Sequence, residues 1–334
     1  MRKETRIALN AYLDQVAKLN GVDSALEKFT VDPSVQQTLE TKIQESSEFL
    51  SRVNNIGVTE QQGEKLGLGI GGPVSSNTDT ALADRQTVDP TDLDAAGYHC
   101  TQTNFDTHLK YSKLDAWAKF PDFQIRVRNS LLIRQALDTI MIGFNGTSRA
   151  ATSDKTVNPL LQDVNIGWLQ KYRAYAAARV MTGGAAAGHL KIGATGDYKN
   201  LDAMVFDLVN NLVDPWYRED TQLVCILGRD LLADKYFPLV NADHPPTEAM
   251  AADLIISQKR VGGLSAVRAP YFPAGKLMIT RLDNLSRYYQ EGSRRRTVID
   301  NPKRDQIENY ESSNDAFVVE DYGCGCVAEN IEFV

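Results

Sequence analysis

The sequence is poor in the residues that build disulfide frameworks and metal centres. Only four cysteines occur among 334 residues, namely Cys100, Cys225, Cys324 and Cys326. Their spacing fits neither a disulfide framework nor a zinc site, because zinc ligands are usually separated by two or more residues and come in fours. We therefore interpret Cys324 and Cys326 as small thiols of a terminal strand, and we expect a reducing compartment and no metal.

Long apolar runs and an excess of basic residues are also missing. No apolar run reaches the roughly 18 residues of a membrane-spanning helix, so no membrane partner is expected. The first residues, MRKETR, lack the apolar segment of a secretory signal peptide. The net charge is −7, which disfavours a dedicated nucleic-acid-binding protein.

Enzyme motifs are scarce as well. The sequence has neither the glycine–serine–glycine elbow of many hydrolases nor a phosphate-binding loop. Gly67, Gly69 and Gly72 have the spacing of a dinucleotide-binding loop, but Pro73 and a polar run follow where that motif needs a helix. We predict no catalytic residue, no cofactor and no metal ligand. A hydrolase with an unrecognised site remains the alternative, because the members of a catalytic triad lie far apart in sequence.

The longest amphipathic segment is 121–145, which we interpret as a structural helix. Apolar residues recur there at intervals of three and four, which places them on one side of a helix. Pro121 is typical of a first helical position, and Asn145 with Gly146 of a helix end. The predicted stripe consists of Phe123, Val127, Leu131, Ile133, Ala136, Leu137, Ile140, Met141 and Phe144.

The segments before this helix predict two short helices and a long hairpin. The first thirty residues form a small helical unit, the N-terminal unit, that we expect to be separate from the main fold. Asp32 and Pro33 predict the start of a second helix. The glycine-rich region 56–111 alternates like two strands, and we expect a β-hairpin that lies on something outside its own domain.

The segments after it mix helices and strands. Helices are predicted at 160–180, 200–213 and 230–240, and strands at 223–228, 276–289, 298–310 and 316–334. No repeating strand–helix–strand unit occurs, so the predicted fold class is α+β. The basic run of Arg294, Arg295 and Arg296 is interpreted as a solvated strand end that pairs with acidic groups, within the chain or across a subunit contact, with phosphate contact as the alternative.

Several segments resemble the major capsid proteins of peduovirus-type phages, the temperate contractile-tailed kind. They occur in order along nearly the whole chain, at 43–50, 122–146, 158–173, 233–241, 254–260 and 309–323. The resemblance implies the Hong Kong 97-type capsid fold. It also implies a structural shell protein rather than an enzyme.

The resemblance implies a division of the chain into parts. These are a helical scaffold-like segment (1–29), an N-terminal arm (30–55), an extended hairpin loop (56–111), a peripheral domain with the spine helix 121–145 (112–199), an axial domain (200–296) and return strands to the peripheral domain (297–334). A maturation protease is implied to cut at Phe29–Thr30.

The implied function is assembly of an icosahedral phage head in the cytoplasm of a host bacterium. The partners would be copies of the chain in hexamers and pentamers, an internal scaffold, the protease and a portal protein. The shell would enclose double-stranded DNA without reading its sequence. Arg294, Arg295 and Arg296 are candidates for charge contacts between subunits.

Overall fold

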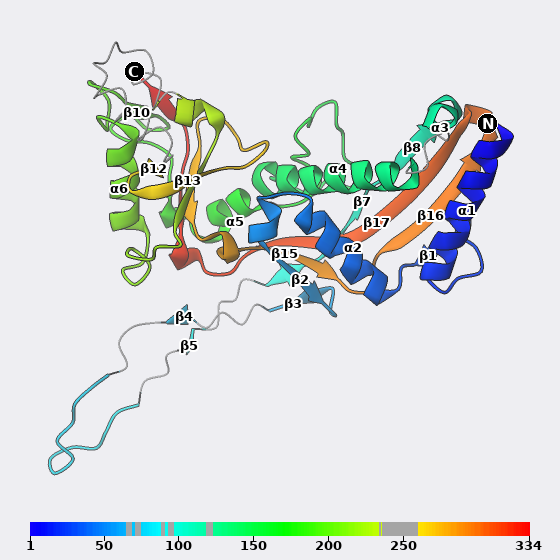
Figure 1. Ribbon diagram of the computed structural model, residues 1–334. Helices are drawn as coiled ribbons and strands as arrows, with labels where there is room; N and C mark the ends of the chain where they lie inside the picture. Colours follow the sequence, from blue (N-terminus) through cyan, green and yellow to red (C-terminus); the bar gives the residue numbers. More distant parts are fainter. Residues whose placement is uncertain are drawn as a thin grey trace, which may run out of the picture.

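The computed structural model describes residues 1–64, 69–70, 75–87, 91–92, 97–117, 123–233, 235 and 260–334. The chain forms an elongated body with two main sheets, and a hairpin extends away from it (Figure 1). Among the described helices, none has the length and apolar character needed to cross a membrane.

The larger sheet has seven strands and is organised around β17 (Gln306–Val319), which is 14 residues long. The strands β16 and β15 flank β17 as antiparallel neighbours, and β7 and β8 also pair with it. The edges are β1, next to β16, and β2, parallel to β15. Their bounds are β1 (Phe29–Thr30), β2 (Asn54–Val58), β7 (Thr101–Asn104), β8 (Thr107–Lys110), β15 (Leu285–Gln290) and β16 (Arg295–Asn301).

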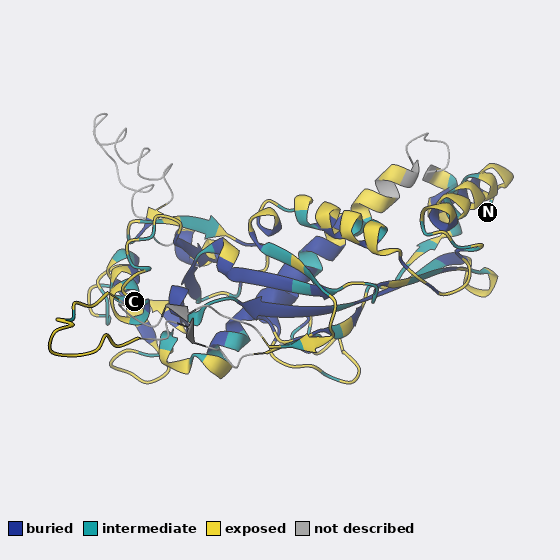
Figure 2. Ribbon diagram, turned by 90° about the horizontal axis from the view of Figure 1, so that it is seen from below, coloured by how far each residue is buried: buried dark blue, intermediate teal, exposed yellow. Residues whose placement is uncertain are grey.

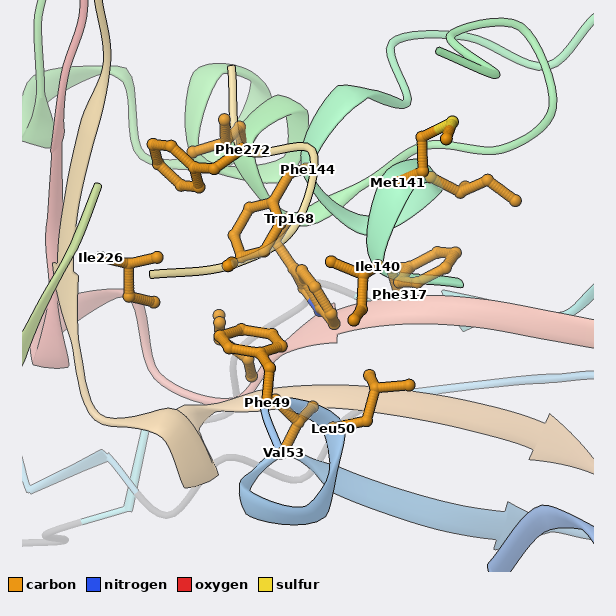
Figure 3. Packing of buried hydrophobic residues seen from close by; sticks show 14 of the residues in the cluster. Phe49, Leu50, Val53, Ile140, Met141, Phe144, Trp168, Ile226, Phe272 and Phe317 are labelled. Atoms are coloured by element: carbon orange, nitrogen blue, oxygen red, sulfur yellow. The ribbon is translucent and has the colours of Figure 1, made fainter. Parts of the chain in front are cut away.

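Three helices and a 3₁₀ turn build the core against this sheet. They are α2 (Pro33–Glu45), α4 (Phe123–Asn145), α5 (Trp168–Tyr175) and η1 (Leu50–Arg52). Trp168 is fully buried, and side chains from η1, α4 and β17 surround it (Figure 3). Its indole nitrogen donates a hydrogen bond of 2.9 Å to the carbonyl of Ser286. Gly143 is required opposite the ring, because an added Cβ would lie 2.3 Å from it.

The second sheet has six strands in the order β12-β13-β11-β14-β18-β9. Both faces of its centre are buried. In β11 (Val224–Leu227), Val224 and Ile226 join the core around Trp168, whereas Cys225 and Leu227 join a second core under α6 (Leu201–Leu212). The other strands are β9 (Val180–Met181), β12 (Arg260–Val261), β13 (Leu264–Arg268), β14 (Leu277–Thr280) and β18 (Cys326–Ala328).

Short elements complete the two sheets. The parallel pair β10 (Leu190–Ile192) and β19 (Ile331–Phe333) also packs in the second core. Four further 3₁₀ turns are η2 (Ala177–Arg179), η3 (Leu282–Asn284), η4 (Pro302–Arg304) and η5 (Tyr322–Cys324). Figure 2 shows that burial is concentrated along the long strands and that the outer helix faces are exposed.

The predicted hairpin is present in the described part of 56–111. Its antiparallel pairs are β3 (Gln62–Gly63) with β6 (Tyr98–His99), and β4 (Gly69–Ile70) with β5 (Thr91–Asp92). Its base covers the second face of the large sheet, where Cys100 packs with Ala316 and Val318. The rest of the hairpin leaves the body (Figure 1).

The N-terminal unit is not separate from the main fold, contrary to the prediction. Helix α1 (Lys3–Leu19) lies on the far end of the large sheet, beside α3 (Tyr111–Trp117) (Figure 1). Leu9 packs with Leu114, Val298 and Ile307 in a small core of its own. The amphipathic pattern of α1 therefore has its partner surface within the same chain.

Several predicted elements differ from the observed ones. The helix expected at 160–180 is only α5, because the preceding residues form turns in which Leu161 has a positive φ of 57°. The strand expected at 276–289 is two strands in different sheets, separated by η3, and that at 298–310 is a hairpin turning at η4. The helix expected at 230–240 is helical at 229–233, and 236–240 lie outside the described residues.

The spine helix was predicted correctly in extent and for most of its buried face, since Ala136, Ile140, Met141 and Phe144 are buried. Ile133, placed on the apolar stripe, is 49% exposed, whereas Leu132 is buried. From Thr139 onward the helix is buried on all sides, so its last seven residues have no solvent face for a pattern to reveal. Pro121 lies outside the described residues, as do the side chains of Phe123 and Val127.

The predicted domain boundaries at 199/200 and 296/297 do not match the sheets. Residue 296 lies inside β16, in the large sheet, whereas β9 and β18 belong to the six-stranded one. The chain instead enters the six-stranded sheet at β9, returns to the large sheet near η3, and enters the six-stranded sheet again near η5.

Candidate assembly elements and a buried charge cluster

Five charged residues form a buried cluster where α2 meets the large sheet. We call Glu40, Arg287, Arg294, Glu311 and Asp315 the charge cluster. The most exposed of them is only 6% accessible. They come from α2, β15, the turn before β16, and β17, so the cluster joins segments that are far apart in sequence.

The cluster is held by direct ion pairs. Glu40 accepts from the guanidinium groups of both Arg287 and Arg294. Arg287 also contacts Asp315 at 2.9 Å, and the Nε of Arg294 donates to Glu311 at 2.7 Å. Gln135 of α4 accepts from Arg294 at 3.0 Å and donates to Glu311 at 3.2 Å. The spine helix is thereby connected to the same network.

Arginine partners keep the carboxylates of Glu40 and Glu311 ionised at neutral pH. Burial by itself would raise the pKa of Glu40, because it disfavours the charged form, but the charges and hydrogen bonds of Arg287 and Arg294 lower that pKa below its usual value. The pKa of Glu311 is lowered in the same way, with Arg294 and Arg296 opposing the effect of burial. The cluster contains no nucleophile, and it acts as a structural clamp on α2.

The basic run 294–296 is therefore not a uniformly solvated strand end. Arg294 is fully buried and its partners are within the chain, which contradicts an intersubunit role for this residue. Arg296 is partly buried and donates to Tyr12 and Asn309, each at 2.7 Å. Arg295 is exposed. The side chains of neighbouring strand residues alternate in direction, which separates Arg295 from the other two.

Glu40 was not found from the sequence, although one signal was present. It lies on the same side of α2 as Gln36 and Ile43, all of them buried. A carboxylate on the apolar side of a helix predicts a buried partner. Its partners could not be identified, because Arg287 and Arg294 are more than 240 residues away.

The segment expected to be cut, Phe29–Thr30, forms the edge strand β1. Phe29 is opposite Arg296 and Thr30 is opposite Arg295. Phe29 is buried against Val16 and Ala25 of the N-terminal unit, while Thr30 is exposed. The junction thus lies on the edge of a sheet, between the N-terminal unit and α2.

The N-terminal unit is attached by polar contacts as well as by apolar packing. Arg6 forms an ion pair with Asp300 of β16. Asp115 of α3 accepts from the Arg2 backbone at 2.8 Å and from the Thr5 hydroxyl at 2.6 Å. These contacts are mostly exposed, so each contributes little and the attachment depends on their combination with the core around Leu9.

The residues considered for catalysis or metal binding are not assembled into a site. The four cysteines are buried and unpaired, and burial raises the pKa of Cys324 and Cys326 to about 12. His99, His108 and His189 are exposed at different places, and His244 lies outside the described residues. In the described ranges no group of three metal-ligating side chains occurs. Gly69 is part of β4, while Gly67 and Gly72 lie outside the described residues.

Two solved capsid structures share this architecture. A chain of the satellite phage P4 procapsid including size determination (Sid) protein has a TM-score of 0.84 and 51% identity, covering 100% of this chain and 99% of that one. The capsid of an empty GTA particle has a TM-score of 0.52 at 15% identity, covering 86% and 90%, which supports the fold alone. The architecture is that of a capsid shell protein with the Hong Kong 97-type α+β fold.

Sequence comparison gives the family. Residues 8–331 match the family described as phage major capsid protein, P2 family. The capsid protein of Escherichia phage P2 is 54% identical over 341 residues, covering 99% of this chain and 96% of the relative. The major capsid protein of Serratia phage KSP20 is 41% identical over 341 residues, covering 100% and 98%. The chain belongs to the P2 family of phage major capsid proteins.

Membership of this family confirms the predicted resemblance and the predicted function. The chain is a structural shell protein of the virion and not an enzyme. The hydrolase alternative has no support among the relatives. The architecture and the charge cluster are accordingly interpreted below in terms of assembly.

Proposed function

We propose that this chain forms the hexamers and pentamers of an icosahedral phage head, assembled in the cytoplasm of a host bacterium around an internal scaffold and a portal protein. The observation that carries the proposal is the hairpin, whose described outer residues 75–87 are almost all exposed and lie away from the body (Figure 1). An arm of this kind buries surface only against another molecule. Closed symmetry then combines many modest contacts into a stable shell.

The parts of the fold are assigned to roles in that shell. The seven-stranded sheet with α2, α4 and α5 would be the peripheral domain, and the six-stranded sheet with α6 the axial domain near the symmetry axes. Phe206 on α6 is 65% exposed and Trp216 is 48% exposed, and exposed aromatic residues are typical of interface centres. Arg295 is the member of the basic run that remains available for a charge contact with another subunit.

The shell would enclose double-stranded DNA without reading its sequence. The net charge of −7 supports this assignment, because a shell with an acidic total does not bind the phosphate backbone strongly. The N-terminal unit would serve as a scaffold-like segment. It would be removed by a maturation protease at Phe29–Thr30, which the position of β1 on a sheet edge supports.

The assembly role is tested by electron microscopy of the full chain produced with its scaffold and portal proteins, beside a variant lacking residues 1–29. We expect closed shells from the full chain. We expect aberrant particles from the variant, because it lacks Leu9 over the core formed with Leu114, Val298 and Ile307. A full chain that stays monomeric under all these conditions contradicts the shell proposal, and shells of unchanged size and yield from the variant contradict the scaffold role.

The processing role is tested by mass spectrometry of shells made with and without the maturation protease. We expect the protease to shorten the chain at or beside Phe29–Thr30, because this junction joins the N-terminal unit to α2 on an edge strand. Shells made without the protease are the matched control and should retain the intact chain. Mature shells with an intact N-terminus, or with a cut inside α1 or α2, would show that the junction is not the processing site.

A further inference from the structure

We propose that the tip of the hairpin, residues 75–87, occupies a cavity between η1 and the end of β13 on a second copy of the chain. This inference rests on the proposed assembly function and adds the two surfaces that meet. The cavity has a volume of about 680 Å³, within the range that accepts a ligand or a few side chains.

The cavity has an apolar floor and a basic rim. Phe49 and Phe272 line it and are buried. Arg52, Arg229 and Arg268 also line it, and these three residues are exposed. Glu48 is the one acidic residue among the lining residues that the structure describes. The site therefore suits an occupant with an apolar group flanked by carboxylates.

The three arginines have no acidic partner within the described part of the chain. Among the other exposed arginines, Arg6 and Arg134 each form an ion pair with an aspartate, whereas Arg295 and Arg304 have none in the described part of the chain. For Arg52, Arg229 and Arg268 the structure describes no ion pair. Three cations gathered on one rim repel one another unless an anion binds between them.

The hairpin tip has the complementary chemistry. Leu82 is 86% exposed, the largest exposure among the large apolar residues that the structure describes. Asp79 and Asp84 lie on either side of it in sequence and are exposed. The tip has a defined shape, because the carboxylate of Asp79 accepts from the Ala81 backbone at 3.0 Å and its carbonyl accepts from Leu82 and Ala83 at 3.1 Å. Leu82 is thus exposed in this turn, with one carboxylate three residues before it and another two residues after it, the latter followed by Arg85.

The geometry favours docking of the tip in the cavity of a second copy rather than in the cavity of its own chain. The tip lies away from the body, whereas the cavity is formed by η1 and the residues after β13 within it (Figure 1). Each copy thus carries one tip and one cavity, so contacts of this kind join copies head to tail and close into rings.

Cysteine cross-linking in assembled particles tests the inference. Ala83→Cys and Glu48→Cys are introduced together in the full chain, which leaves Leu82, both aspartates and the three arginines unchanged. We expect oxidised particles to give a ladder of disulfide-linked multimers on non-reducing gels, and each single variant to give none. The four native cysteines are buried and unpaired, so they should not contribute.

The matched control is Ala83→Cys combined with Ser153→Cys, an exposed loop residue outside the cavity. Two results would overturn the inference while the shell proposal stands. Either particles form normally but give no disulfide-linked multimers, or the control variant gives the same multimers to the same extent. A compact cross-linked monomer would show that the tip folds onto its own cavity, which also overturns it. Absence of particles from the unmodified chain would instead contradict the shell proposal.

A second measurement does not depend on cross-linking. Leu82→Asp is expected to weaken the contact about tenfold or more and to raise the concentration needed for assembly accordingly, because the leucine would no longer be buried. Val157→Asp is the control, since Val157 is 73% exposed in another loop. Equal effects of the two substitutions would mean that Leu82 has no particular partner.

Discussion

Replacing Arg294 with alanine is expected to lower the free energy of unfolding by about 3–5 kcal/mol, the usual cost of removing one partner from a buried ion pair. Arg294 is fully buried and contacts both Glu40 and Glu311. Without it, Glu311 loses its main counter-charge and Glu40 loses one of two, while both carboxylates keep their desolvation cost. The measurement is urea unfolding of the unassembled full chain.

Arg295 provides the matched control, because it is the next residue, the first of β16, and its side chain is exposed. Arg295→Ala should change the free energy of unfolding by less than about 0.5 kcal/mol, as is usual for surface substitutions. If the two variants unfold at the same urea concentration, the charge cluster does not clamp α2 as described. A loss of assembly in Arg295→Ala at unchanged stability would support its role between subunits.

Trp168→Ala should cost about 3–5 kcal/mol, the range for truncating a buried tryptophan. The ring packs edge-on against Phe144 and Phe317, each with ring centroids 5.2 Å apart, and its nitrogen donates to Ser286. Truncation leaves a cavity where α4, α5 and β17 meet, and it leaves the Ser286 carbonyl without this donor. Thermal unfolding of the unassembled chain would report the loss.

Trp216 is the control for this substitution, since it is 48% exposed and its described ring contact is with Tyr217 at 6.0 Å. Trp216→Ala should lower the free energy of unfolding by less than about 1 kcal/mol. Comparable losses at the two positions would mean that the core around Trp168 can collapse to fill the space. Trp168 would then not be the centre of the fold.

The sequence was most informative where local signals act alone. Asp32 and Pro33 predicted the start of α2, and Asp32 does accept from the Ser34 backbone there. Asn200 similarly caps α6, close to its predicted start. The glycine-rich alternation predicted the hairpin. Its size predicted that it packs against a surface outside its own domain. Each of these inferences needs only a few consecutive residues.

Long-range pairing accounts for most of what could not be predicted. The charge cluster joins α2 to strands more than 240 residues later, and a basic run gives no sign that one of its members is buried. The division between sheets was also hidden, because β14 and β15 are separated by the single turn η3 yet belong to different sheets. Residue patterns report the face that a strand buries but not the sheet that it joins.

The six-stranded sheet restricts movement within the subunit, because its two faces pack in two different hydrophobic cores. Met278 of β14 faces the core of the large sheet, and Leu277 and Ile279 face the core under α6. Side chains are close-packed on both faces of this sheet, so the core around Trp168 and the core under α6 cannot slide past each other without repacking. We therefore expect each subunit to keep one rigid shape at sites of different shell curvature, with the adjustment made by the hairpin and the N-terminal unit.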